Sequence, residues 1–444
     1  MTWPARVVVA LTSILAAFAG HASDCAALAT EKLPHVRITA VRQVQAGAFT
    51  APDGARLDVP EFCRVQGEAQ PTADSQIGFE VWLPASDWNG RYYQLGSGGF
   101  AGSIHHPSLA AELRRGNAVA ATDTGHRGDA LDATWARNHP EKIIDYGYRA
   151  VRETSHAAKA LVRAYYRKPA RYSYFTGCSN GGRQALMAAQ RFPEDWDGIL
   201  AGAPAYDWTR QLATFAWIQH AFHTLPADAA LRVFREGPRD QQTGERLYFG
   251  FAVDPDRDAE LQLTFAEQFF GNMVHDDPAW RIERFDGPRD FELAQQRRIG
   301  NSTLSRVLDA TDPDLTAFER LRGKLLMYFG WADALISPHA GVDYYERVVA
   351  RLGGAERTQA FFRLFMVPGM GHCQGGTGPG AFGQAYVTPG LRDDPEHDIR
   401  RALEAWVERG AVPQRIVAVK YRNDDRLQGS EATQVLNPYT VGEQ

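Results

Sequence analysis

A serine between small residues is the feature of this sequence most suited to chemistry. Ser179 lies at the centre of a Gly-x-Ser-x-Gly motif formed with Gly177 and Gly181. A strand-like run ends just before the motif and a helix-like run begins just after it. In that context the serine occupies a sharp turn that requires tiny flanking residues, and the helix N-terminus favours developing negative charge. We therefore predict a nucleophile at Ser179; the alternative is a glycine-rich loop.

A serine nucleophile needs a base and an acid that orients it, and each should follow a later strand. Asp333 follows the apolar run at 324–329, and His372 follows the run at 361–367. Both residues therefore occur in the required order, although a helix cap and a turn histidine are the alternatives. His339 is a weaker base candidate because it falls in a helical stretch. Three further aspartates precede the strand, at its wrong end: Asp309, Asp312 and Asp314.

A second glycine-rich segment, at 95–102, superficially matches a dinucleotide fingerprint. No convincing helix follows it, so that interpretation is weak. We expect this loop to supply one backbone N–H of an oxyanion hole, from Gly98 or Gly99, and Asn180 to supply the other. A plain glycine-rich turn is the alternative.

The four cysteines are informative through their positions. Cys178 precedes the candidate nucleophile and Cys373 follows the candidate base. A disulfide holds two Cα atoms about 5.5–6 Å apart, so this pair would bring the serine and the histidine within hydrogen-bonding reach. Cys25 and Cys63 would then pair with each other. Four cysteines allow three connectivities, and free thiols are a further alternative; only this pairing gives both flanking cysteines a physical role.

The elements that must position these residues alternate along the chain. Apolar runs predict strands, and apolar residues at helical spacing predict helices. We expect strands at 79–84, 92–95, 118–122, 172–176, 199–203, 324–329 and 361–367, and helices at 148–165, 183–192, 341–351 and 399–407. Strands that alternate with helices imply an α/β fold with a mostly parallel sheet.

Residues 206–322 interrupt this alternation and are rich in aromatic side chains. We interpret the segment as a lid inserted into a catalytic domain at 23–205 and 323–444; a continuation of the main domain is the alternative. The aromatic rings of the lid would bury the ring of an acyl group. The acidic cluster at 254–258 is interpreted as a solvated turn.

The composition of the 444 residues is that of an ordinary globular protein, and the net charge is −5. No basic excess exists to neutralise a phosphate backbone, which argues against a nucleic-acid binder. The first 22 residues have the charged, apolar and small-residue layout of a secretory signal peptide; a buried helix or a membrane anchor is the alternative. We expect a secreted or periplasmic protein with no membrane association after cleavage, in a compartment where cysteines pair.

These motifs together resemble the tannase and feruloyl esterase family of secreted serine esterases. The resemblance runs from about residue 25 to 419 and is carried by Cys178-Ser179, Asp333, His372-Cys373 and the stretches at 95–102, 121–126, 145–149 and 201–204. It implies an α/β-hydrolase core with a lid and a disulfide between the cysteines beside the serine and the histidine. It also implies hydrolysis of small esters of hydroxycinnamic, gallic or terephthalic-type acids through an acyl-enzyme.

The resemblance also implies a calcium loop in the lid, flanked by its own cysteines. No such loop and no cysteine occur between Ala205 and Gly323, so we predict no metal site, and the expected chemistry requires no cofactor. A short-chain acyl hydrolase or a peptidase is the alternative on the same fold, because a triad does not separate these activities. A non-catalytic binding protein would have lost a member of the triad, and none is missing.

Overall fold

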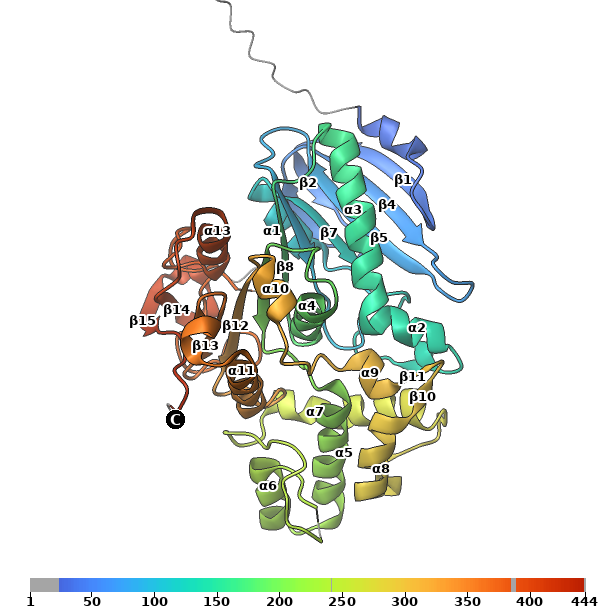
Figure 1. Ribbon diagram of the computed structural model, residues 1–444, viewed down its shortest axis with the longest axis vertical. Coiled ribbons are helices and arrows are strands. Elements are labelled where there is room, and N and C mark those ends of the chain that lie inside the picture. The colour runs from blue at the N-terminus through green and yellow to red at the C-terminus, as the bar shows by residue number, and fades with distance from the viewer. Residues whose placement is uncertain (1–23, 241, 385–388, 443–444) are drawn as a thin grey trace, which may run out of the picture.

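The computed structural model describes residues 24–240, 242–384 and 389–442; the predicted signal peptide lies outside these residues. Its centre is a nine-stranded sheet (Figure 1). The strands lie in the order β1 (Val36–Val44), β4 (Phe62–Ala69), β5 (Ile77–Pro84), β7 (Ala118–Thr122), β6 (Arg91–Leu95), β8 (Tyr172–Cys178), β9 (Gly198–Gly202), β12 (Lys324–Gly330) and β13 (Phe362–Val367). From β7 to β13 every neighbouring pair is parallel, whereas β1, β4 and β5 join through antiparallel pairs. The predicted α/β fold with a mostly parallel sheet is confirmed.

The position of β6 between β7 and β8 creates the crevice of this sheet. The chain runs from β6 to one neighbour, β7, and then crosses to the other side of β6 to form β8. Loops that leave the carboxyl ends of strands on either side of such a switch point diverge, and ligands bind between them. The loop after β6 holds Gly98 and Gly99, and the turn after β8 holds Ser179. The topology therefore places both predicted glycine motifs at one crevice.

Helices cover both faces of the sheet. Successive side chains of a strand point to opposite faces, and in these strands both faces carry buried apolar side chains. Tyr93 and Val119 contribute to the core that contains α1 (His106–Arg114), whereas their neighbours Tyr92 and Ala120 contribute to the core that contains α3 (Ala150–Tyr166). This is the two-residue period of a strand buried on both sides. Figure 1 shows α3 in front of the sheet, next to α4 (Asn180–Arg191).

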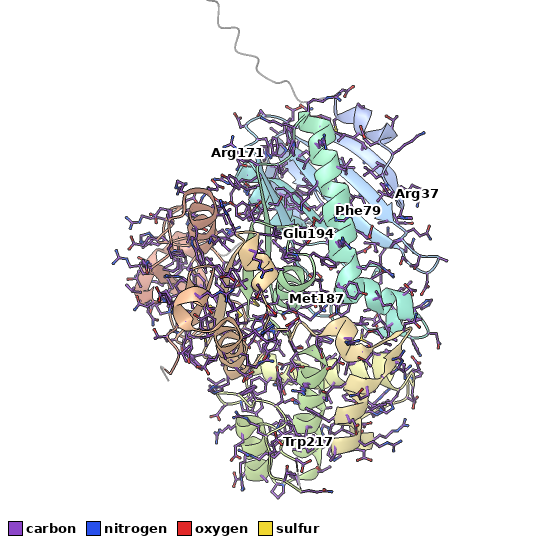
Figure 2. All side chains as sticks on the ribbon, viewed as in Figure 1. Arg37, Phe79, Arg171, Met187, Glu194 and Trp217 are labelled. Atoms are coloured by element: carbon purple, nitrogen blue, oxygen red, sulfur yellow. A yellow bond between two sulfur atoms is a disulfide. The ribbon has the colours of Figure 1, made fainter. Side chains whose placement is uncertain are left out.

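The segment between β9 and β12 is helical. It contains α5 (Trp208–Thr224), α6 (Ala227–Glu236), α7 (Arg257–Phe269), α8 (Gly287–Gln296), α9 (Leu304–Leu308), α10 (Thr316–Arg320) and the short pair β10 (Arg298–Ile299) and β11 (Ser302–Thr303). Figure 1 shows α5, α6 and α8 together beyond one end of the sheet, and Figure 2 places Trp217 among them.

Many aromatic rings of this helical segment pack against one another. The Phe270 and Trp280 rings stack at 4.9 Å between centroids, and the Trp217 ring meets the Phe285 ring at 6.0 Å. The aromatic richness that predicted a ligand-burying lid is therefore used largely for the segment's own core. Trp208 and Phe265 are the rings that approach the glycine loop, at 5.7 and 5.4 Å from the Phe100 ring.

The C-terminal part completes the sheet's other edge. It contains α11 (Pro338–Leu352), α12 (Ala355–Gln359), α13 (Ile399–Arg409) and an antiparallel pair of β14 (Ile416–Tyr421) and β15 (Ser430–Leu436). The remaining pair, β2 (Gly47–Thr50) and β3 (Arg56–Val59), lies near the N-terminus. Among the described residues, the helices are too short or too polar to cross a membrane.

Candidate active site

The turn between β8 and α4 holds Ser179 in a strained conformation. Its φ of 62° and ψ of −124° are rare for a residue with a side chain. The backbone N–H of Ser179 donates to the Gly202 carbonyl at 3.0 Å, which anchors the turn to β9. A Cβ on Gly177 would lie 2.6 Å from the backbone of Gly181, so the turn requires glycine there. The structure thus contains the sharp strand–turn–helix that the motif predicts.

Asp333 and His372 come together at the same carboxyl edge of the sheet. The His372 Nδ1 atom lies 2.8 Å from Asp333 Oδ2. The other carboxyl oxygen accepts the backbone N–H groups of Leu335 and Ile336 at 2.9 and 2.8 Å, and Asp333 is fully buried. A carboxylate fixed in this way holds the imidazole with its proton on Nδ1, which leaves Nε2 able to accept a proton.

The other candidates for base and acid lie elsewhere. His339 is in the first turn of α11, with its ring 5.5 Å from that of Trp331. Among the described contacts, no hydrogen bond joins His339 to Asp333. Asp309 accepts hydrogen bonds from Thr209, and the remaining two aspartates that precede β12 engage neighbouring backbone and side-chain groups: Asp312 and Asp314.

Two disulfides join Cys178 to Cys373 and Cys25 to Cys63, the pairing expected from the sequence. The first links the end of β8 to the loop after β13, across 195 residues, with the Cα atoms 6.0 Å apart. Because Ser179 and His372 are the direct neighbours of this bond, it ties the serine turn to the histidine loop. The second bond attaches the N-terminal 3₁₀ turn to β4.

The loop after β6 presents backbone N–H groups beside the serine turn. Ser97 N–H donates to Gln184 Oε1 at 3.0 Å, and Phe100 N–H donates to the Ala130 carbonyl at 2.7 Å. Within the described part of the chain, no acceptor is found for the N–H groups of Gly98 and Gly99, which lie between them. Gly99 has a φ of 52°, and a Cβ there would lie 2.2 Å from the Ala130 oxygen. The backbone of this loop is thus fixed on both sides of two unbonded donors.

A buried network below the serine joins the two glycine motifs. The Tyr146 hydroxyl lies 3.0 Å from the Gly99 carbonyl oxygen and 3.2 Å from Asn180 Oδ1. Arg183 Nε donates to the same Asn180 oxygen at 2.8 Å, and Asn180 Nδ2 donates to the Ser97 carbonyl at 3.2 Å. Sequence reasoning missed the role of Tyr146, although the residue falls in the stretch at 145–149 that carries the family resemblance.

Arg183 is fully buried one turn into α4, and carbonyl groups are its main partners. Its guanidinium donates to the carbonyls of Gly147, Leu308 and Tyr146 at 2.8–3.1 Å. It also lies 4.8 Å from the Tyr146 ring centroid. Burial lowers the pKa of Arg183, and the Tyr146 and Asp309 groups oppose that shift. A buried positive charge therefore lies beneath the turn that carries the nucleophile candidate.

The pKa of His372 is raised above its ordinary value of 6.5. Burial is the largest single influence and acts to lower this pKa. The charge and hydrogen bond of Asp333, together with the carboxylates of Asp258 and Asp256, outweigh burial. The last two residues belong to the start of α7, in the helical segment after β9. Carboxylates from the helical segment after β9 therefore raise the pKa of the histidine.

The chain matches the family model described as tannase and feruloyl esterase over residues 63–233 and 229–441. An uncharacterized esterase of Xanthomonas campestris pv. campestris is 40% identical, over 98% of this chain and 90% of that protein. The chain belongs to the tannase and feruloyl esterase family. It is therefore an esterase, as the sequence predicted.

Further relatives agree with this family and with the fold. A protein of Aspergillus fumigatus named probable feruloyl esterase B-2 is 26% identical over 93% of this chain and 91% of its own. A solved esterase from Aspergillus oryzae superposes with a TM-score of 0.82 at 26% identity, covering 94% of this chain and 95% of that one. Feruloyl esterase B from Aspergillus oryzae has a TM-score of 0.83 at 23% identity, covering 94% and 95%. These structures establish the α/β-hydrolase fold.

The calcium loop implied by the family resemblance does not fit the residues found here. Asp254 forms an ion pair with Arg235, and Asp256 caps α7 by accepting the N–H groups of Asp258 and Ala259. Among the described residues, no group of three or more metal-ligating side chains is placed to hold an ion. The solvated turn predicted at 254–258 extends only to Asp256; Asp258 lies half-buried in the first turn of the helix.

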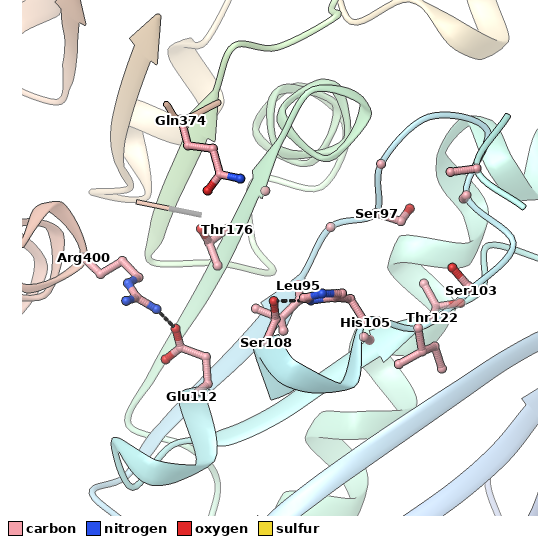
Figure 3. Close-up of a pocket in the computed structure, with 17 residues that line it drawn as sticks. Leu95, Ser97, Ser103, His105, Ser108, Glu112, Thr122, Thr176, Gln374 and Arg400 are labelled. Atoms are coloured by element: carbon pink, nitrogen blue, oxygen red, sulfur yellow. Dashed lines mark hydrogen bonds and ion pairs between the residues drawn. The ribbon is translucent and has the colours of Figure 1, made fainter. Parts of the chain in front are cut away.

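A cavity of about 430 Å³ adjoins the site on the α1 side of the sheet (Figure 3). Its lining residues include Gly98, Gly177 and Gln374, so the cavity borders the glycine loop and lies next to the residues joined by the Cys178–Cys373 disulfide. Figure 3 shows the ion pair of Glu112 and Arg400 at its side. Ser179 and His372 are not among the residues that line it.

Proposed function

We propose that this esterase is a secreted serine carboxylesterase that hydrolyses small esters of aromatic acids. The observation that carries the proposal is the convergence of three residues from three loops at one sheet edge. The Asp333–His372 hydrogen bond of 2.8 Å orients the base, and the Cys178–Cys373 disulfide anchors that base beside Ser179. The relatives named feruloyl esterases favour an aromatic acyl group.

In the proposed reaction the Nε2 atom of His372 takes the proton of the Ser179 hydroxyl. The Ser179 oxygen attacks the ester carbonyl, and Asp333 stabilises the imidazolium that forms. His372 then donates the proton to the leaving alcohol, which leaves an acyl-enzyme. Water, activated by the same histidine, releases the acid and restores the serine. No cofactor takes part in these steps.

The oxyanion of each tetrahedral intermediate would be held by backbone N–H groups. We assign these to Asn180, the residue after the nucleophile, and to Gly98 or Gly99 in the loop after β6. The unbonded N–H groups of these glycines support this assignment, because donors that need not be reorganised stabilise the transition state most effectively. The N-terminus of α4 adds favourable potential at the same place.

We also propose that residues 206–322 act as the lid of a catalytic domain formed by 23–205 and 323–444. In this arrangement Trp208 and Phe265 would contact the acyl ring, since their rings approach Phe100 beside the glycine loop. The signal-like N-terminus and the two disulfides support export to the periplasm or beyond the cell.

The test compares Ser179→Ala with wild type on methyl ferulate, methyl gallate, p-nitrophenyl acetate and an anilide. We expect Ser179→Ala to lose activity on every ester and to lose labelling by a fluorophosphonate probe. Ser173→Ala, on the same strand, is the matched control and should keep both. Esterase activity that survives Ser179→Ala would refute the proposed nucleophile. Anilide hydrolysis at a rate comparable with the esters would favour the peptidase alternative.

A further inference from the structure

Helix α7 contacts two loops of the proposed active site. Gln262 is fully buried and its Nε2 donates to the Ala334 carbonyl at 3.0 Å, directly beside Asp333. One turn later, the Phe265 ring lies 5.4 Å from the ring of Phe100, in the glycine loop. One face of α7 therefore spans from the aspartate loop to the glycine loop.

Asp258 occupies the same face, one turn before Gln262. Residues four apart on a helix are neighbours, and their side chains lean toward the helix N-terminus. Because Gln262 bonds to the Ala334 carbonyl, Asp258 lies about one helical turn from the loop that carries Asp333. Its half-buried position agrees with this placement.

Asp258 and His372 each shift the pKa of the other, which agrees with this placement. Burial raises the pKa of Asp258, the charge of His372 opposes that rise, and Asp256 and Asp333 add to it. In turn, Asp258 and Asp256 raise the pKa of His372. The carboxylate of Asp258 and the imidazole of His372 therefore interact electrostatically.

Among the described residues, no ion pair joins a cation to Asp258, and three arginines of the same segment lie in other environments. Arg257 is exposed and has the weakest of the resolved effects on Asp258. Arg246 lies over the Phe249 ring, 4.5 Å from its centroid, and acts on His339. Arg235 is held by Asp254. The lid-side charges that act on His372 are the carboxylates of Asp258 and Asp256.

We infer that Asp258 is a specificity-determining residue that makes this site select neutral or cationic aromatic esters over esters that carry a carboxylate on the acyl ring. The inference rests on the proposed function, and it narrows the acyl groups expected from the sequence. Hydroxycinnamic and gallic esters fit this site, whereas a terephthalate monoester, with its negative ring substituent, is disfavoured. An anionic substituent would approach Asp258 without a partner, and like charges in a partly desolvated cleft repel each other.

The test uses two esters of the same shape and different charge, methyl 4-carbamoylbenzoate and monomethyl terephthalate. We expect wild type to show a larger kcat/KM for the neutral amide. Asp258→Asn should reduce the ratio of the kcat/KM value for the neutral ester to that for the anionic ester by about threefold to tenfold. Raising the salt concentration should also reduce this ratio in wild type, because salt screens the charge of Asp258. Asp254→Asn, on the same loop but paired with Arg235, is the matched control and should leave the ratio unchanged.

Failure of the inference and failure of the proposed function give different results. An equal ratio in wild type and Asp258→Asn, with both esters hydrolysed, would overturn the inference and leave the esterase assignment intact. If neither ester is hydrolysed, the aromatic-acid proposal fails, and calorimetric binding of the same two esters to Ser179→Ala decides the inference. The inference is supported if Ser179→Ala binds the anionic ester more weakly than the neutral one and if the added Asp258→Asn substitution removes that difference. Equal binding of the two esters to Ser179→Ala, or no binding of either, overturns the inference.

Discussion

The Tyr146 hydroxyl offers a sharp test of whether the glycine loop and the serine turn work as one unit. This hydroxyl has a single proton and lies 3.0 Å from the Gly99 oxygen and 3.2 Å from Asn180 Oδ1. It therefore bridges the two segments that we propose as donors to the oxyanion. Tyr146→Phe removes the bridge and keeps the ring, its packing and its contact with Arg183.

The expected effect on stability is modest. Asn180 Oδ1 keeps the Arg183 Nε–H at 2.8 Å, so the Gly99 carbonyl is the acceptor that loses its described partner. A buried acceptor left unpaired costs about 1–3 kcal/mol. The expected effect on catalysis is of similar size in free energy but appears directly in kcat. Removing an oxyanion-hole donor outright costs a factor of about 10²–10³ in kcat, and a mispositioned donor should cost about tenfold, or about 1.4 kcal/mol.

The assay measures kcat and KM on methyl ferulate together with unfolding in urea. Tyr206→Phe is the matched control, because its buried hydroxyl also donates to a backbone carbonyl, that of Ala340 at 3.0 Å, away from the glycine loop. We expect similar losses of stability in the two variants and a fall in kcat, with little change in KM, only for Tyr146→Phe. An unchanged kcat, or an equal fall in the Tyr206→Phe control, would refute a positioning role for Tyr146.

Three further outcomes follow from the same structure. Replacing Cys178 and Cys373 by serine should lower the free energy of unfolding by about 5 kcal/mol, the value of the chain-entropy model for a separation of 195 residues. Urea unfolding measures this loss. The variant should also have a lower kcat in the fraction that stays folded, and an unchanged kcat would contradict the anchoring role. The acid limb of the kcat/KM profile should lie above pH 6.5, because His372 must be neutral to act and its pKa is raised; a limb below that value would contradict the His372–Asp333 pair. Burial raises the pKa of Asp309, so the folded state favours its neutral form, and this contribution to stability is present at acidic pH and lost as the pH rises through the raised value. Melting temperatures measured from pH 4 to 8 should therefore fall in wild type more than in Asp309→Asn, and parallel curves would show that this carboxyl does not titrate on unfolding.

The elements nearest the site were the easiest to predict from the sequence. The structure has strands at all seven predicted runs, and β7 has the predicted bounds. These strands are buried on both faces, so they appear in the sequence as continuous apolar runs. By contrast, β1 and β14 were not predicted. The side chains of β1 are partly buried or exposed, and those of β14 are buried or partly buried. Such short patterns in a long chain do not distinguish strands from loops.

The sequence by itself determined which residues could react. Three signals indicated them: the glycines around Ser179, the order of Asp333 and His372 after their strands, and the cysteines beside the serine and the histidine. Each signal depends on backbone geometry within a few residues or on one covalent bond. Those signals were sufficient to indicate the α/β-hydrolase fold and the esterase family.

Only the tertiary structure decided what surrounds those residues. Tyr146, Arg183 and Asp258 reach the site from a π-helical turn, the interior of α4 and the first turn of α7. Their sequence neighbours carry no motif that links them to the serine, and their roles arise from burial and from the charges that packing brings together. The Asp258 carboxylate acts on His372 because α7 packs against the loop of Asp333. The selection of substrates that we infer for Asp258 therefore depends on the folded chain.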